Sequence, residues 1–133
     1  MVTKQAGGHL DEADLTRADS LAREIFSDIA NKWALLIINM LDERTLRFSE
    51  LRTAIEGISH KMLTQNLRML ERNGLVVRTV HATVPPRVEY TLTEAGQALQ
   101  RTVDGICDWT LRHLPHIEKA RLRFRANEDA RQG

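Results

Sequence analysis

The sequence predicts a mainly α-helical protein with a small β-hairpin, which places it in the α+β class. Two short amphipathic helical patterns meet at the turn Gly57-Ile58-Ser59, and a β-branched hairpin follows between Leu75 and Leu92. Longer helical patterns lie on either side of this segment. A helix-turn-helix followed by a hairpin is the outline of a winged helix-turn-helix, here with N- and C-terminal dimerisation helices.

The first helix of the pair is expected over residues 48–56. Its apolar stripe consists of residues that recur at helical spacing: Phe48, Leu51, Ala54 and Ile55. Gly57 should end this helix, because glycine tolerates the left-handed conformation that is common just past a helix end. Ser59 then stands where an N-cap belongs, since its hydroxyl can accept a hydrogen bond from a backbone N–H of the next helix.

The second helix, expected over residues 60–72, is the candidate recognition helix. Three leucines at helical spacing should face the core: Leu63, Leu67 and Leu70. The opposite face carries three cations, an amide and a hydroxyl: Lys61, Thr64, Gln65, Arg68 and Arg72. Arg and Lys can hydrogen-bond guanine in the major groove, Gln can hydrogen-bond adenine, and each can hold phosphate. Together with Ser59 and His60 these residues are candidate DNA contacts, and the alternative is an ordinary solvated face.

The hairpin is the candidate wing, with strands expected over residues 75–80 and 88–92. Its tip contains Pro85 and Pro86, which cannot donate to a strand ladder and therefore mark the end of pairing. The cations of the wing are candidate contacts to phosphate or to the minor groove: Arg78, His81 and Arg87. The alternative is that they are ordinary exposed residues of a hairpin.

The charge distribution favours a nucleic-acid partner for this segment. Residues 47–90 include seven basic and four acidic side chains, a net charge of +3, whereas the whole chain carries +1. A near-neutral protein with a basic module of this kind is expected to bind DNA in a salt-sensitive way.

The composition fits one globular domain and argues against other classes of protein. The chain has 133 residues, of which 42% are hydrophobic and 28% charged. A single cysteine excludes an internal disulfide, no apolar run approaches the ~20 residues of a membrane span, and the N-terminus lacks a hydrophobic signal core. A cytoplasmic protein is therefore expected. Metal-ligand spacings, a glycine-rich phosphate loop and a nucleophile elbow are all missing from the sequence, so we expect no enzyme activity, metal or cofactor.

The chain is expected to have three parts. Residues 1–13 are predicted to be a flexible N-terminus, residues 14–114 the winged-helix domain with its dimerisation helices, and residues 115–133 a charged tail or a short helix.

The two terminal helices of the domain are predicted to build a dimer interface. The first should begin near Asp14 or Asp19, and the last should run from its N-cap Thr93 to Pro115, which ends it. Because two recognition helices must lie about one DNA turn apart, ~34 Å, one chain offers only half of the binding surface. Apolar residues are candidates for the interface or for an effector cleft, with the core as the alternative: Trp33, Met40, Leu99, Val103, Ile106 and Trp109.

Cys107 is the only thiol and is interpreted as a small buried hydrophobic residue. The neighbouring Asp108 disfavours the reactive thiolate form. The alternative is a redox role at the dimer interface.

Three stretches of the sequence resemble the HxlR-type regulators, in the order found in that family. They are residues 31–37, the candidate recognition helix with the start of the wing (residues 58–78), and the second half of the wing (residues 84–93). The resemblance covers about residues 20–112 and implies a small winged-helix repressor or activator of MarR-like architecture that binds a palindromic site as a homodimer. Family members often respond to electrophiles or oxidants through a cysteine near the N-terminus. Counting back from Trp33, that position is Ser20 in this chain, so the usual thiol switch is not expected.

These observations together predict a sequence-specific DNA-binding transcriptional regulator. The alternative is a winged-helix interaction module whose face, formed by Lys61, Gln65 and Arg68, binds an acidic protein. The combination of base-reading residue types with a Pro-Pro-Arg wing favours DNA. A small-molecule effector between the dimer helices is a further expectation.

Overall fold

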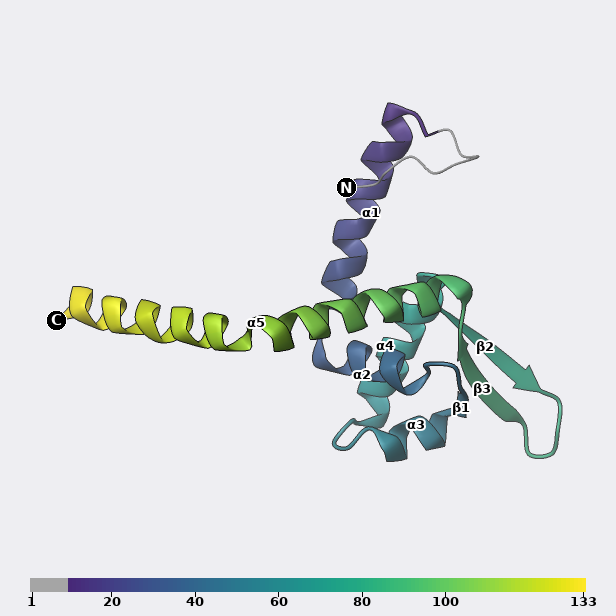
Figure 1. The fold of residues 1–133 in the computed structure, drawn as a ribbon. Coiled ribbons are helices and arrows are strands. Elements are labelled where there is room, and N and C mark those ends of the chain that lie inside the picture. The colour runs from purple at the N-terminus through teal and green to yellow at the C-terminus, as the bar shows by residue number, and fades with distance from the viewer. Residues whose placement is uncertain (1–9) are drawn as a thin grey trace. The chain divides into compact units, whose positions relative to one another are not determined.

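A computed structural model describes residues 10–133 of the chain (Figure 1). The elements are, in order, α1 (Glu12–Ile29), α2 (Lys32–Met40), β1 (Thr45–Arg47), α3 (Phe48–Ala54), α4 (His60–Arg72), β2 (Val76–His81), β3 (Arg87–Leu92) and α5 (Glu94–Gln132). The chain forms two compact units, one up to Gln97 and one over Ala98–Gly133. A mainly helical chain with one small antiparallel sheet confirms the predicted fold class. The N-terminus predicted to be flexible comprises residues 1–13, of which residues 1–9 lie outside the described residues and Glu12 and Ala13 already belong to α1.

Helix α1 begins earlier than the predicted start at Asp14 or Asp19. Asp11 is the N-cap, because its side chain accepts a hydrogen bond from the backbone N–H of Asp14 at 2.8 Å and its own N–H donates to the Asp14 carboxylate at 3.4 Å. This reciprocal pair is a capping box. Asp14 is therefore the third residue of the helix, which begins two residues before Asp14 and seven before Asp19.

Helices α1 and α2 are separate, although their apolar residues read as one stripe in the sequence. Asn31 caps α2 by accepting from the Ala34 N–H at 2.9 Å, while its amide donates to the Asp28 carbonyl at 2.8 Å. One side chain thus ends the first helix and starts the second. The break lets α2 turn its buried residues, Ala34, Ile37 and Ile38, into the core of the first unit.

The core of the first unit is made by α2, α3 and α4 and by the base of the wing. Its largest fully buried side chains are Ile37, Ile38, Leu41, Leu51, Leu63 and Leu70. Each such side chain contributes roughly 1.5–3 kcal/mol on burial. Leu63 and Leu70 fix one side of α4 in this core, so that the opposite side of the helix faces solvent.

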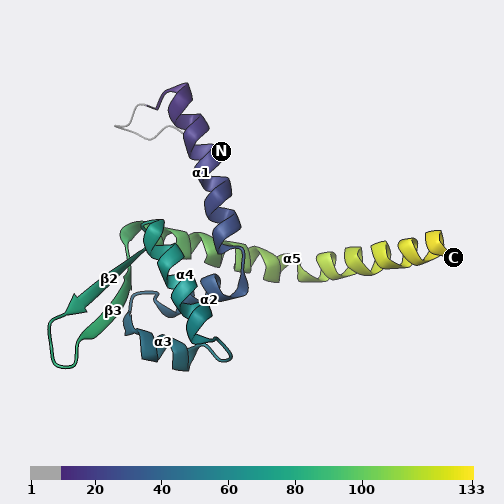
Figure 2. The ribbon, with the colours of Figure 1, turned by 180° about the vertical axis from the view of Figure 1, so that it is seen from behind.

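The sheet is antiparallel with strand order β1-β3-β2, and its hairpin extends beyond the helices of the first unit (Figure 2). Strands β2 and β3 lie within one residue of the predicted bounds. Strand β1 was not predicted. It is only three residues long, and it is a strand because Leu46 pairs with Tyr90 and the hydroxyls of Thr45 and Thr91 lie 2.9 Å apart.

The two ends of the wing meet the end of α4 and the start of α5 at one junction. Thr93 donates its hydroxyl to the Gly74 carbonyl at 2.7 Å and its N–H to the Leu75 carbonyl at 3.0 Å. The Thr93 hydroxyl also accepts from the Gly96 N–H at 3.0 Å, which confirms the N-cap predicted for α5. Gly96 leaves no room for a side chain, because a Cβ there would lie 2.1 Å from the Leu75 carbonyl oxygen.

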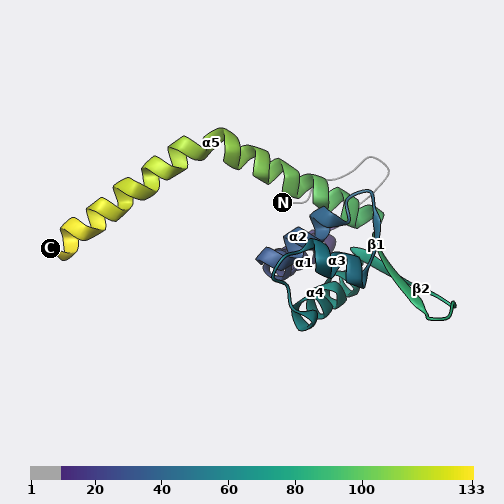
Figure 3. The ribbon, with the colours of Figure 1, turned by 90° about the horizontal axis from the view of Figure 1, so that it is seen from below.

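Helix α5 continues past Pro115 to Gln132, so the prediction that Pro115 ends it was wrong. Proline lacks an N–H and its ring crowds the carbonyl four residues earlier, which usually kinks a helix and often breaks it. Here the helix changes direction near its middle without ending (Figure 3). The residues that follow, from Glu118 to Arg125, are mostly strong helix formers, which favours continuation. None of the described helices is long and apolar enough to cross a membrane.

The close approach at Gly96 leads to a paired prediction on stability. Gly96→Ala should lower the free energy of unfolding by about 1–3 kcal/mol, because backbone atoms must move to admit the methyl group. The matched control is Gly105→Ala in the same helix, where an added Cβ meets nothing within 4 Å. That change should raise stability by roughly 0.5–1 kcal/mol, since alanine is the better helix former. Urea denaturation followed by circular dichroism measures both, and equal stabilities for the two variants would contradict the junction described above.

Candidate nucleic-acid interface

Helix α4 has the bounds predicted for the recognition helix, and its N-terminus is fixed by two residues. Gly57 has φ +85°, the left-handed conformation expected after α3. Ser59 Oγ accepts from the Met62 N–H at 3.1 Å, as predicted for the N-cap. The predicted inner residues Leu63, Leu67 and Leu70 are buried.

The inner side of α4 also holds a polar residue that the sequence analysis missed. Asn66 is 7% exposed, and its amide donates to the Met62 carbonyl at 2.8 Å. Its position between Leu63 and Leu70 on the apolar stripe was the available signal. Because the amide bonds within its own helix, Asn66 belongs to the packed side of α4.

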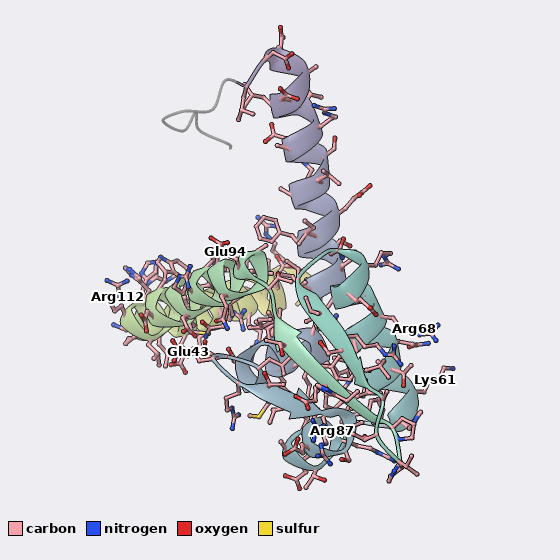
Figure 4. All side chains as sticks on the ribbon, turned by 90° about the vertical axis from the view of Figure 1, so that its right-hand side faces the viewer. Glu43, Lys61, Arg68, Arg87, Glu94 and Arg112 are labelled. Atoms are coloured by element: carbon pink, nitrogen blue, oxygen red, sulfur yellow. The ribbon has the colours of Figure 1, made fainter. Side chains whose placement is uncertain are left out.

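The outer side of α4 carries the predicted reading residues. His60, Lys61, Gln65, Arg68 and Arg72 are all exposed. Figure 4 shows Lys61 and Arg68 projecting from the same side of the helix. Thr64 is half-buried, and its hydroxyl donates to the His60 carbonyl at 2.8 Å, so it retains only its acceptor capacity for a ligand.

Two of the candidates on α4 are also held by other elements. The His60 ring lies 4.8 Å from the Phe48 ring of α3, centroid to centroid. Arg72 lies 3.6 Å from the Asp28 carboxylate at the end of α1, and the same oxygen accepts from the Asn73 amide at 3.3 Å. Arg72 therefore shares its charge with an acid, whereas no ion pair is described for Lys61 or Arg68 within residues 10–133.

A groove of about 590 Å³ lies between α4 and the wing. It brings Arg78 of β2 together with Arg68 and Arg72 of α4, which the sequence could place only on separate elements. The full lining is Phe48, Thr64, Leu67, Arg68, Glu71, Arg72, Arg78 and Tyr90. Three guanidinium groups and one carboxylate give this groove a net positive charge, which suits a phosphate backbone.

The basic residues predicted as wing contacts are divided between the two faces of the sheet. Arg78 pairs with Tyr90 across the hairpin, whereas His81 pairs with Arg87, three residues further along β2. Because side chains alternate along a strand, Arg78 lies on the face of α4 and the other two lie on the opposite face. There, the Arg87 Nε and the His81 Nε2 approach one oxygen of Glu89 at 2.8 Å and 3.1 Å. Glu89 was not among the predicted site residues.

The wing tip adds an apolar surface beside these cations. A second open groove, of about 560 Å³, lies between the start of α3 and the tip. Val84 at the tip is fully exposed. The tip residues line the groove together with Arg47, Phe48 and Ser49 of the neighbouring β1–α3 segment.

The residues predicted for a dimer interface or effector cleft lie on α2 and α5. On α2, Trp33 is half-buried beside the Gly57 turn, with the Lys32 ammonium 4.6 Å from the centre of its ring, and Met40 is also half-buried. On α5, Leu99 and Val103 are covered in part or in full, whereas Ile106 and Trp109 are more than half exposed. Trp109 lines an open groove along α5 itself with His113, His116, Ile117, Ala120, Arg121, Phe124 and Arg125.

Cys107 is exposed, so its interpretation as a buried hydrophobic residue is wrong for the single chain. It occupies a position on α5 between the exposed Ile106 and Trp109. Within the described part of the chain, no three His, Cys, Asp or Glu side chains come together as a metal site.

The chain matches the model of the HxlR-like helix-turn-helix family over residues 28–118. It is 39% identical over 108 residues to an uncharacterized HTH-type transcriptional regulator of Escherichia coli K12, YtfH, an alignment that covers 81% of this chain and 86% of that protein. Among solved structures, it is similar to a protein of Enterococcus faecalis V583 assigned to the MarR family of transcriptional regulators. That similarity has a TM-score of 0.67 and 36% identity, and covers 88% of this chain and 99% of the other.

A second solved structure, the oxidised form of the redox regulator HypR, is similar with a TM-score of 0.62 and 35% identity over 68% of this chain and 94% of the other. The family match spans the helix-turn-helix and the wing, which form the basic surface described above, and it continues along α5 to residue 118. The chain belongs to the HxlR-like helix-turn-helix family of DNA-binding transcriptional regulators.

Proposed function

We propose that this regulator binds a palindromic operator as a homodimer, with α4 of each copy in the major groove and the wing against the adjacent backbone. The observation that carries the proposal is the exposed side of α4, where Lys61, Gln65 and Arg68 lie beside a groove lined by three arginines. Donor groups of these types suit guanine, adenine and phosphate.

The candidate contacts divide into two roles. Lys61, Gln65 and Arg68 are proposed to reach base edges, because they are exposed on the outer side of α4. The remaining candidates are proposed to hold phosphate: Ser59, His60, Thr64, Arg72, Arg78, His81 and Arg87. Phosphate contacts fix the orientation of the protein on the duplex, and base contacts provide the specificity.

The homodimer is supported by apolar surface on the terminal helices. On α1, Leu21 and Phe26 are each 55% exposed. On α5, exposed apolar side chains include Ile106, Trp109, Leu111 and Leu114. Large apolar side chains exposed along a helix favour an interaction surface, and a second copy would also provide the second recognition helix at ~34 Å.

The proposed effector response does not use the usual N-terminal thiol. The similar protein HypR is named a redox regulator, but this chain has Ser20 at the position where the family cysteine falls. Its one thiol, Cys107, lies on the proposed dimer helix α5. We propose that a small-molecule effector acts at the dimer helices, where Trp109 lines an open groove.

DNA recognition is tested by fluorescence-anisotropy titration with the intergenic DNA upstream of the protein's own gene. Binding should be tighter than to unrelated DNA of equal length, and affinity should fall at least about tenfold between ~50 and ~200 mM salt, because each phosphate contact releases counterions. Equal and weak binding to both duplexes would contradict the proposal. It would favour the alternative, a module whose basic face binds an acidic protein.

Arg68 and Arg87 should differ in how their loss affects DNA binding. Arg68→Ala should weaken binding to the operator by about 1–3 kcal/mol and relax specificity at one position per half-site, because a base contact is lost. Arg87→Ala should weaken binding more evenly across sequences. Arg52→Ala, an exposed arginine of α3 outside the proposed contacts, is the control and should bind like the parent. Unchanged affinity in both test variants, with folding and dimerisation intact, would show that the reading surface has been misplaced.

The role of Cys107 has a simple test. Cys107→Ser should keep the DNA affinity of the parent, both before and after treatment with diamide, because the proposed contacts to DNA do not involve the thiol. The anisotropy titration is repeated on both proteins with and without oxidant. A loss of binding on oxidation in the parent, absent from Cys107→Ser, would instead assign a redox role to this residue.

A further inference from the structure

We propose that Glu89 is a positioning residue for DNA binding, which holds Arg87 and His81 at the wing and so prepares Arg87 to bind phosphate. The inference rests on the proposed function and adds an acidic residue to a surface that was otherwise defined by its cations.

The three side chains lie together because of the register of the hairpin. His81 of β2 is directly opposite Arg87 of β3, and Glu89 is two residues further along β3. Residues two apart on a strand share a face, and cross-strand partners face the same side of the sheet. The carboxylate of Glu89 therefore lies next to both side chains, and a single oxygen, Oε1, approaches Nε of Arg87 and Nε2 of His81.

The ion pair between Glu89 and Arg87 is partly shielded from solvent. The Glu89 side chain is 24% exposed and that of Arg87 39% exposed. The Arg87 Nε is buried, and although it lies 2.8 Å from Glu89 Oε1, its N–H is not aligned for a hydrogen bond. The attraction is thus mainly that of charge. Without the carboxylate, this partly buried cation would lose the ion pair with Glu89, and the guanidinium would be expected to move toward water.

The chemistry of the guanidinium leaves room for a second ligand. The group has five N–H donors, one on Nε and four on the two terminal nitrogens. Glu89 occupies the Nε side, so the terminal pair can still donate to one phosphate in the bidentate arrangement that arginine favours. An arginine already held in one rotamer loses less conformational entropy on binding than a free one.

A simple charge argument predicts the opposite effect of Glu89. A carboxylate near the DNA backbone repels phosphate, so its removal alone should strengthen binding. Arg87 forms an ion pair with this carboxylate, however, and Arg47 of β1 is the register partner of Glu89 on the neighbouring strand. Its repulsion of DNA is therefore offset locally, whereas its hold on Arg87 is direct. If Glu89 mainly repels DNA, neutralising it should raise the affinity for DNA. If it mainly positions Arg87, neutralising it should lower that affinity.

The experiment is a double-mutant cycle on the full chain, read by anisotropy with the upstream DNA. Glu89→Gln should weaken binding about threefold to thirtyfold, within the range of coupling between contacting residues, and should cause no further loss in an Arg87→Ala background. Glu89→Asp, which keeps the charge, should lose less. Glu56→Gln is the matched control, because Glu56 is an exposed acid in the turn before α4, and it should bind as tightly as the parent or more tightly.

Two results would overturn the inference. One is binding by Glu89→Gln that equals or exceeds that of the parent, as the charge argument predicts. The other is an equal loss in the presence and absence of Arg87, which would mean that Glu89 supports the sheet and does not act through Arg87. Thermal melting of each variant keeps loss of folding apart from loss of binding, and Glu89→Asp replaces Glu89→Gln in the cycle if the latter is unfolded. Failure of the parent itself to prefer the upstream DNA would count against the proposed function.

Discussion

The wing depends on the backbone contact between Gly96 and Leu75. The absence of a side chain at Gly96 lets the start of α5 lie against the Leu75 carbonyl, and Thr93 binds the backbone of Gly74 and Leu75 beside it. The Leu75 N–H in turn donates to the Leu70 carbonyl at the end of α4. Both ends of the hairpin are thus fixed to the recognition helix. This connection positions the wing beside α4, so that Arg78 lines the same groove as Arg68 and Arg72.

The two faces of the wing differ in chemistry. The face toward α4 carries Arg78 and the buried Tyr90, so it extends the basic surface of the recognition helix. The opposite face places Arg87 and His81 beside one acid, Glu89. A net positive charge attracts DNA at long range, but a held guanidinium determines where a phosphate binds. A count of charges along the sequence describes the first property and says nothing of the second.

Membership of the family does not transfer every property of its members. The helix-turn-helix and the wing align with the family model, and similar solved structures include a protein named a redox regulator. The sequence of this chain has a serine where the family thiol is expected, and its single cysteine lies elsewhere, on α5. The elements that match the family's DNA-binding module therefore do not include the thiol through which family members often respond to oxidants.

Local sequence determined helix α4 and the outline of the wing. Gly57, Ser59 and the leucine spacing act within one or two helical turns, so they fixed α4 at its observed bounds. Only the tertiary structure revealed the pairings between residues that lie far apart in the sequence. Strand β1 requires β3, Arg72 meets Asp28 of α1, and Glu89 meets His81 across the hairpin. The rule that proline ends a helix also failed at Pro115, because strong helix formers follow it and favour continuation of α5.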